Sequence, residues 1–170
     1  MDGITIRAAT KADAAAITRV HLAAWRGAYR GILPDSTLAL FALPKKHWTE
    51  RLSVRSPAVT FVSEQNAEIF GWATIGPSRD ADLAEQNFWE LYGMYLLPAR
   101  WRLGAGTLLW RAAEQALRER AVRQVSLWVL ETNQRARAFY EQLGFVADGA
   151  VQTITRLDIP LPQRRYRLAL

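Results

Sequence analysis

The sequence contains no cysteine, and this absence excludes several kinds of site at once. Disulfides, a thiol nucleophile and a zinc site built on thiolates all require cysteine. The two histidines, His21 and His47, stand far apart and form no recognisable metal motif. We therefore expect no metal, and the composition suits a reducing compartment.

Long apolar runs are missing as well. No stretch reaches the ~18 apolar residues that a membrane span needs. The opening "MDGITIRAAT" lacks the basic-then-apolar pattern of a signal peptide. We expect a soluble, cytoplasmic protein with no membrane partner. Half of the 170 residues are hydrophobic, which is enough for one core, so one domain is expected over residues 1–170.

The net charge is +6, and arginine supplies most of the positive side chains. A basic balance favours polyanionic partners, from nucleic acid to small molecules. The basic residues are scattered, and the sequence contains no basic recognition helix or aromatic-basic sheet motif. We therefore expect no nucleic-acid partner, whereas a polyanionic small molecule fits the charge.

Apolar periodicity predicts a mixed α/β (α+β) fold with a central sheet. A first strand is expected at "ITIRAAT", and the helix after Thr10 should bury Ile17 and Val20. Further helices are expected at about 37–52 with an interruption at Pro44, at about 104–120 and at 133–143. The remaining strands are expected at 58–64, 67–76, 88–97, 124–130, 145–157 and 164–170, with a hairpin turn at "QN" between the second and third strands.

The stretch "MYLLPARWRLGAGTLLW" places Gly104 and Gly106 between a predicted strand and a predicted helix. Free N–H groups at a helix N-terminus hold phosphate oxygens, and glycine lets the backbone approach the ligand. Arg100 and Arg102 can add charge-assisted contacts. The alternative is a helix cap with a packing contact. A P-loop is excluded because no Gly-Lys-Ser/Thr follows, and a Rossmann dinucleotide site does not fit because the third glycine is missing.

The stretch "ETNQRARAFYEQLGF" predicts a short helix that is capped by Asn133 and ended by Gly144. Phe139 and Tyr140 suit the core face of that helix. The hydroxyl of Tyr140 also needs a partner, and a phenol at the edge of a cleft can act as a general acid. Taken alone, each of these residues is better explained by a structural role than by a functional one.

The combined pattern N-x-x-A-x-x-F-Y-E-x-x-G-F over residues 133–145 resembles the C-terminal motif of GNAT-type acyl-CoA N-acyltransferases. The glycine loop after "MYLLP" is similar to the pyrophosphate-binding motif of that family, and "IRAATKADAAAI" is similar to its first strand and helix. The resemblance implies a splayed, mixed, mostly antiparallel sheet of about seven strands flanked by about four helices. It also implies an N-acetyltransferase that moves an acetyl group from acetyl-CoA directly to a primary amine of a small molecule or peptide.

The resemblance assigns the contacts to acetyl-CoA. Backbone groups of the strand at 88–97 would pair with the pantetheine arm, and main-chain amides of the glycine loop would hold the pyrophosphate. Asn133 would contact the cofactor arm, and Tyr140 would protonate the departing thiolate. The cofactor residues are Met94, Tyr95, Leu96, Trp101, Arg102, Leu103, Gly104, Ala105, Gly106 and Asn133. The sequence departs from the family at Trp101, where Gln or Arg is usual, and at Trp128, where some relatives carry a glutamate base.

Glu90 is the candidate general base, because an acid in an apolar strand beside a cleft suits proton transfer. The alternative is a glutamate on the solvent face of an edge strand. His21 is a rival base, and water is a third. His21, Trp25 and Tyr29 recur at helical spacing and are candidates for the acceptor site, with plain packing as the alternative.

Several matters stay open at this level. The acidic loop with Asp80, Asp82 and Glu85 either attracts a cationic amine or is merely solvated. The same fold also admits a non-catalytic CoA-binding sensor or structural domain. The sequence identifies neither the acceptor amine nor a strict choice of acetyl over other acyl groups, and both a monomer and a homodimer are compatible with it.

Overall fold

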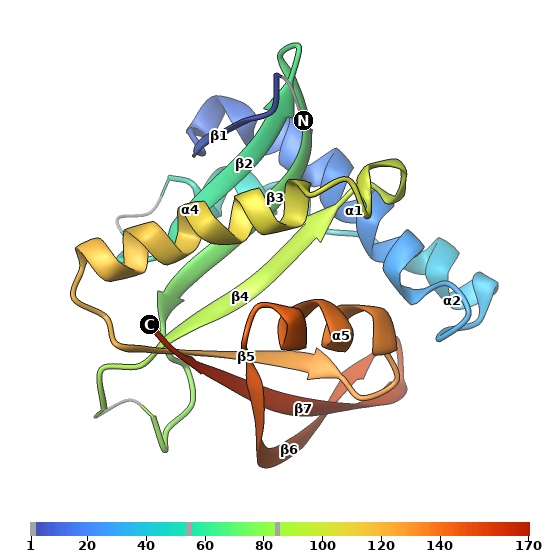
Figure 1. The fold of residues 1–170 in the computed structure, drawn as a ribbon. Helices are drawn as coiled ribbons and strands as arrows, with labels where there is room; N and C mark the ends of the chain where they lie inside the picture. Colours follow the sequence, from blue (N-terminus) through green and yellow to red (C-terminus); the bar gives the residue numbers. More distant parts are fainter. Residues whose placement is uncertain (1–2, 54–55, 84–85) are drawn as a thin grey trace.

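The computed structural model describes residues 3–53, 56–83 and 86–170. Within these ranges, seven strands form one mixed sheet in the order β1-β2-β3-β4-β5-β7-β6 (Figure 1). All neighbouring strands are antiparallel except β4 and β5, which run parallel. The predicted mixed, mostly antiparallel sheet is thus confirmed. The strands are β1 (Thr5–Ala8), β2 (Val59–Gln65), β3 (Glu68–Pro77), β4 (Trp89–Leu96), β5 (Gln124–Leu130), β6 (Val146–Arg156) and β7 (Ile159–Ala169).

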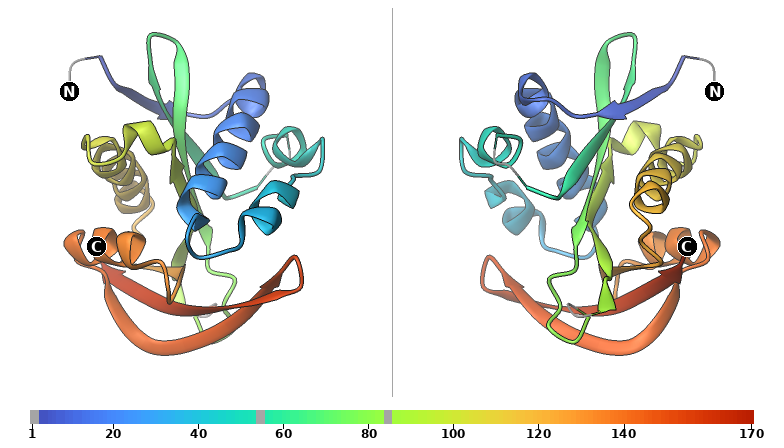
Figure 2. Two further views of the ribbon diagram at one scale, coloured as in Figure 1. Left: turned by 90° about the vertical axis from the view of Figure 1, so that its right-hand side faces the viewer. Right: turned by 90° about the vertical axis from the view of Figure 1, so that its left-hand side faces the viewer.

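The helices cover both faces of the sheet. In the side views of Figure 2, α1, α2 and α3 lie on one face, and α4 and α5 lie on the other. The prediction of one interrupted helix at about 37–52 becomes two short helices, because residues 41–46 around Pro44 leave the helical conformation. The α-helices of the described ranges are α1 (Ala14–Tyr29), α2 (Asp35–Leu40), α3 (His47–Arg51), α4 (Ala105–Glu119) and α5 (Gln134–Gln142). None of these helices combines the length and apolar composition needed to cross a membrane.

The core has separate parts on the two faces. On the first face, Ile17 and Val20 of α1 are fully buried, as predicted, and pack in one cluster with Trp48 and Trp72. On the second face, Leu109 and the rest of the apolar stripe of α4 pack with β5 and with residues from the end of α5. Burial of these stripes at ~25 cal/mol per Å² of apolar surface is the main force that fixes both layers against the sheet.

The two terminal strands form a longer hairpin than the sequence indicates. Strand β7 begins at Ile159, five residues before the predicted start, and the two-residue turn at Leu157 and Asp158 has positive φ angles of 49° and 62°. Pro160 and Pro162 are tolerated because this end of β7 pairs with β6 alone, since the last pair with β5 is Leu130 with Gln163. A proline without an N–H costs a strand no ladder bond on an unpaired edge.

The hairpin between β2 and β3 is confirmed, with its turn one residue later than predicted. Asn66 and Ala67 occupy the turn with φ angles of 51° and 62°. Two successive positive φ angles are typical of the tight hairpin turn whose twist matches that of the strands.

Candidate active site

The parallel strands β4 and β5 separate along their length. They pair only where they begin, at Trp89 with Val125 and at Glu90 with Ser126. Beyond these pairs the two strands diverge, as Figure 1 shows. The predicted splay is therefore present, and it opens a gap in the middle of the sheet.

A large open cavity of about 1380 Å³ occupies this gap. Its wall takes residues from α1, α3, β4, the loop before α4, β5, α5 and the β6–β7 hairpin. Pockets for one small ligand are commonly ~300–1000 Å³, so this volume has room for a long ligand and a second small one. The residues predicted to bind the cofactor, to act in catalysis and to meet the acceptor almost all line this one cavity.

The edge of β4 lines the cavity through Met94, Tyr95 and Leu96. These residues pair with β3 on one side, while the side facing β5 has no strand partner in the described part of the chain. The carbonyl of Leu96 instead accepts a hydrogen bond from Nε1 of Trp101 at 2.9 Å. Apart from that carbonyl, the segment is a free sheet edge, which an extended ligand can join by backbone hydrogen bonds.

A β-bulge precedes that edge. Gly93 pairs with Thr74 and Leu91 with Ile75, so Tyr92 is the extra residue on β4. The Tyr92 hydroxyl donates to the carbonyl of Pro77 at 2.7 Å, which fixes the ring against β3. A bulge bends its strand and re-aims the side chains next to it.

The loop between β4 and α4 has the shape expected of an anion site. Arg102 and Gly104 adopt left-handed conformations with φ angles of 60° and 77°, and Ala105 begins α4. The first N–H groups of a helix have no partners within it, so they are available to an anion. Leu103 is exposed, whereas Gly106 packs tightly, since a Cβ atom there would lie 3.2 Å from Cζ of Phe139.

Positive charge at this loop comes from a residue that sequence reasoning missed. The guanidinium carbon of Arg135, on the first turn of α5, lies 3.6 Å from the centroid of the Trp101 ring. Its pKa is lowered by burial and, next, by the charge of Arg102. Neither arginine has a carboxylate partner among the residues described. Arg100, by contrast, donates to Oε1 of Gln65 at 2.7 Å.

Although Trp101 carries no charge itself, Arg135 supplies positive charge at the loop. Trp101 serves as the platform on which Arg135 stacks, and cation–π contacts of this kind hold a guanidinium in place. The only sequence signal was the position of Arg135, two residues after the helix-capping asparagine.

Tyr140 and Asn133 lie at the two ends of α5 and both line the cavity. Oδ1 of Asn133 accepts from the amide of Ala136 at 3.2 Å, which confirms its predicted role as helix cap. Tyr140 is 9% exposed, and its hydroxyl makes no hydrogen bond to any described residue. Burial, followed by the neighbouring Tyr29, raises the pKa of this phenol. The hydroxyl thus stays protonated at neutral pH.

The stripe of His21, Trp25 and Tyr29 on α1 faces the same cavity. Trp25 stacks on Phe41 with ring centroids 3.7 Å apart, and the hydroxyl of Tyr29 lies 3.5 Å from that of Tyr95. The stripe packs and lines the cavity at once, so both interpretations of its spacing hold. His47, on α3, also lines the cavity and is only partly exposed.

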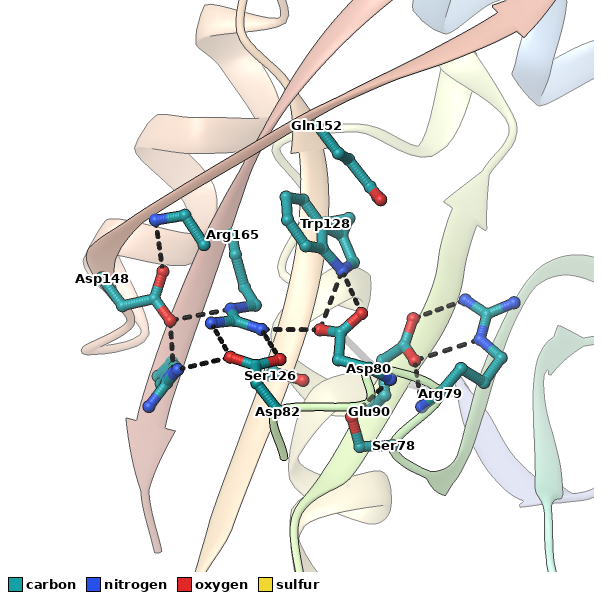
Figure 3. Close-up of polar contacts among 12 residues, drawn as sticks. Ser78, Arg79, Asp80, Asp82, Glu90, Ser126, Trp128, Asp148, Gln152 and Arg165 are labelled. Carbon is teal, nitrogen blue, oxygen red and sulfur yellow. Dashed lines mark hydrogen bonds and ion pairs between the residues drawn. The ribbon is translucent and has the colours of Figure 1, made fainter. Parts of the chain in front are cut away.

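Glu90 is buried in β4, with 1% of its surface exposed, which contradicts the alternative of a solvent-facing glutamate. Its Oε2 accepts from the backbone N and from Nε of Arg79 at 3.1 and 3.0 Å, and its Oε1 accepts from a terminal nitrogen of the same guanidinium (Figure 3). Both residues line the cavity. The carboxylate is thus on the cavity wall but fully engaged by one partner.

The acidic loop is not merely solvated. Asp80 and Asp82 both bind Arg165 of β7, whose side chain is 6% exposed, and Asp148 of β6 binds the same guanidinium at 2.8 Å. Nε1 of Trp128 donates to both oxygens of Asp80 at 3.0 Å (Figure 3). This network ties the β3–β4 loop to the C-terminal hairpin and holds Trp128 and Asp80 on the cavity wall. Glu85, the third predicted acid, lies outside the described residues.

No group of three or more His, Asp or Glu side chains suited to a metal ion occurs in residues 3–53, 56–83 and 86–170.

Comparison with known proteins gives a consistent result. Residues 21–145 match the family model described as "Acetyltransferase (GNAT) family". The chain is 33% identical over 131 residues to "Uncharacterized N-acetyltransferase YuaI" of Bacillus subtilis, covering 76% of this chain and 73% of that protein. It is 29% identical over 170 residues to "Probable N-acetyltransferase Rv2775" of Mycobacterium tuberculosis, covering 97% and 93%. The fold is similar to the PaiA N-acetyltransferase of Thermoplasma acidophilum solved with coenzyme A, with a TM-score of 0.75, 20% identity and coverage of 96% and 99%.

Proposed function

Since the chain belongs to the acetyltransferase (GNAT) family, we propose that it moves an acetyl group from acetyl-CoA directly to a primary amine of a small molecule or peptide, with Tyr140 as the general acid. The observation that carries this proposal is the free edge of β4 at Met94–Leu96, which faces the same cavity as the unpartnered hydroxyl of Tyr140. One sheet takes strands from both ends of the chain, so the proposal treats residues 1–170 as one domain.

The cavity fits a long polyanionic cosubstrate such as acetyl-CoA. The free edge of β4 suits the amide groups of the pantetheine arm, which can pair with it as a strand does. The N-terminus of α4, with Arg102 and Arg135 beside it, suits the phosphates. The similar PaiA structure holds coenzyme A, which supports this assignment.

In the proposed reaction the amine nitrogen attacks the thioester carbonyl carbon, and the carbon–sulfur bond breaks. The amine loses one proton and the sulfur gains one, so no oxidant or metal is needed. Direct attack requires no enzyme nucleophile, only two reactants held in line. In this proposal a backbone N–H of the free β4 edge polarises the carbonyl.

Tyr140 donates its proton to the sulfur as negative charge develops there, and water reprotonates the phenol after the thiol has left. Burial keeps the phenol in its protonated form, so the donor is present across the neutral range. Asn133 caps α5 and thereby fixes the helix that carries Tyr140.

The proton of the amine goes to Glu90 or to water in this proposal. Glu90 lies on the cavity wall, but Arg79 must shift before an amine can reach either oxygen. His21 is a poor base, because burial, followed by the charges of His47 and Arg51, lowers its pKa to about 4.

Thermal unfolding with acetyl-CoA, with ATP and NAD as controls, tests the first part of the proposal. A ligand at ~100 times its Kd stabilises the fold by about 2.7 kcal/mol, which shifts Tm by several degrees at this size. Acetylation of a broad panel of amines, followed by mass spectrometry, tests the second part. A shift with acetyl-CoA but no acetylated amine would favour the non-catalytic CoA-binding alternative.

A further inference from the structure

Arg51 is a cavity residue that the proposed chemistry does not use. It ends α3 and lines the cavity beside Trp48 and Tyr92. Its guanidinium carbon lies 5.7 Å from the Trp48 ring centroid and 5.6 Å from that of Tyr92. The side chain is solvent-exposed, so its charged end is open to a ligand in the cavity.

Arg51 has no anionic partner in the described part of the chain, and it makes no hydrogen bond there. Its pKa is lowered chiefly by burial and then by the charge of Arg79. Arg51 is thus a cation on the cavity wall, close to two aromatic rings and without a carboxylate among the described residues to neutralise it, so an anionic ligand in the cavity would find an unpaired guanidinium there.

The charged groups around Arg51 indicate the charge of a matching ligand. Arg79 lies over the Tyr92 ring as Arg51 does, with its guanidinium carbon 4.3 Å from the ring centroid. The charge of Arg79 is already paired with Glu90 (Figure 3). Two guanidinium groups and one carboxylate leave one positive charge. A planar monoanion matches both that charge and the fork of donors on Arg51.

Arg51 is distinct from the cations at the phosphate loop. The cation that perturbs Arg51 is Arg79, whereas the cation that perturbs Arg135 is Arg102. The aromatic neighbours of Arg51 come from α3 and β4, and those of Arg135 come from the loop before α4. Because the proposed function gives the loop before α4 to the phosphates of the cosubstrate, Arg51 is then left for the acceptor.

We infer that the acceptor amine also carries a carboxylate, and that Arg51 binds this carboxylate. This inference rests on the proposed function, because it assigns a substrate class to the same cavity. The acceptor is then an amino acid or a related amino carboxylate, with its amine directed to the acetyl group and its acid held by Arg51.

The test uses amines in matched sets and measures kcat/KM for acetylation. Each amino acid is compared with its own carboxamide, and each amino carboxylate with the alkylamine and the aminoalkylphosphonate of equal length. We expect the carboxylate to exceed the uncharged partner by roughly 10- to 100-fold, since a hydrogen bond to a charged group is worth that much. In Arg51→Met the ratio should fall close to one, and in Arg51→Lys it should be intermediate.

Arg111→Met is the matched control. Arg111 is an exposed arginine on α4 that lies outside the cavity wall, so its loss should leave the ratio unchanged. The acetyl-CoA melting shift of each variant shows that it is folded and binds the cosubstrate.

Three results would overturn the inference while leaving the proposed function intact: equal rates with carboxylates and carboxamides, an unchanged ratio in Arg51→Met, or a preference for the dianionic phosphonates. The absence of acetylation of every amine, charged or not, would instead contradict the proposed function, and the inference would fall with it.

Discussion

The indole Nε1 of Trp48 donates a hydrogen bond to Nδ1 of His21 at 3.2 Å. Because Nδ1 accepts this bond, the ring is neutral and carries its proton on Nε2. The same ring stacks on Tyr95 with centroids 5.3 Å apart and lies 4.9 Å from Trp72. His21 therefore links α1 to α3 and β4 as a neutral packing residue.

Acid should destabilise the protein through His21. Its pKa is about 4 in the folded state and 6.5 in the unfolded reference, so the unfolded chain binds the proton more readily. The stabilising effect is complete above pH 6.5 and is lost as the pH falls from 6.5 towards 4. A shift of this size corresponds to about 3 kcal/mol, taken as an order of magnitude. Urea unfolding from pH 7.5 to pH 4 measures it.

His21→Gln removes the titrating group, so the stability difference between wild type and variant should shrink over that pH interval. His47→Gln is the control. The pKa of His47 is lowered too, with burial as the main cause, but His47 is less buried and should contribute less. An equal pH dependence of wild type and His21→Gln would contradict the assignment of a neutral His21.

Tyr140→Phe removes a hydroxyl that no described residue binds, so the fold should be nearly unaffected. If Tyr140 is the general acid, kcat should fall by roughly 10²- to 10⁴-fold, while the affinity for acetyl-CoA stays within a factor of two or so. Steady-state kinetics and calorimetric titration with acetyl-CoA separate these two quantities.

Tyr29→Phe supplies the matched control for Tyr140. Its hydroxyl lies in the same cavity, 3.5 Å from that of Tyr95, on the stripe expected to meet the acceptor. This variant should change KM for the amine more than kcat. A similar loss of kcat in both variants would indicate that neither phenol has a special role in proton transfer.

Much of the fold could be predicted because local patterns agree with the final packing. Ile17 and Val20 recur at helical spacing and are buried, and Gly144 ends α5 at a φ of 93° as its position indicates. The position of the turn at Leu157 and Asp158 could not be predicted, since Asp tolerates a positive φ but Leu rarely adopts one. Its conformation is imposed by the long pairing of β6 with β7.

Motifs predicted many of the residues that line the cavity, whereas its charged contacts could not be predicted. Arg165 and Asp80 are 85 positions apart, and only the sheet order places β7 beside β5 and the β3–β4 loop. Arg51 and Arg135 lie against the rings of Trp48 and Trp101, and no spacing in the sequence indicates these contacts. Such contacts depend on tertiary structure alone.

Replacing Arg165 with Met should strongly lower the free energy of unfolding. The buried guanidinium binds three aspartates, and among the described residues its loss leaves Asp80 without a cationic partner and Asp148 with Arg167 alone. Removing one partner from a buried ion pair costs roughly 3 to 5 kcal/mol. Denaturant unfolding at pH 7 measures this loss, and the fluorescence of the protein should report the release of Trp128 from Asp80.

Arg164→Met, at the next position on the same strand, is the control for Arg165. Arg164 pairs with Glu131, and both side chains are more than 40% exposed, so the expected loss is only about 0 to 1 kcal/mol. Equal losses in the two variants would mean that the buried network adds nothing beyond a surface ion pair.

Gly106→Ala should act on both packing and cosubstrate affinity. The added Cβ would lie 3.2 to 3.3 Å from the Phe139 ring, so this ring must give way slightly, and overpacking of this kind typically costs roughly 1 to 3 kcal/mol. The double variant with Phe139→Leu provides the missing space. If the loop binds phosphate through its backbone, the double variant should regain stability but not its affinity for acetyl-CoA. Recovery of both would show that Gly106 serves helix packing alone.

Glu90→Gln separates two roles for the buried carboxylate of β4. A base that takes the proton of the amine must be ionised, so the amide should lower kcat and abolish the rise of the rate with pH. If the carboxylate only holds Arg79 in place, Glu90→Gln should have the same effect on the rate as Arg79→Met, because each variant breaks the same contact.

Arg79→Met is therefore measured beside Glu90→Gln, together with the double variant, over the pH range in which both enzymes are folded. As a base, Glu90 should give the larger loss of kcat, and Arg79→Met should leave the pH profile intact or speed the reaction by freeing the oxygens. Three equal profiles, with the double variant no worse than either single one, would assign Glu90 to positioning of Arg79 and leave deprotonation of the amine to water.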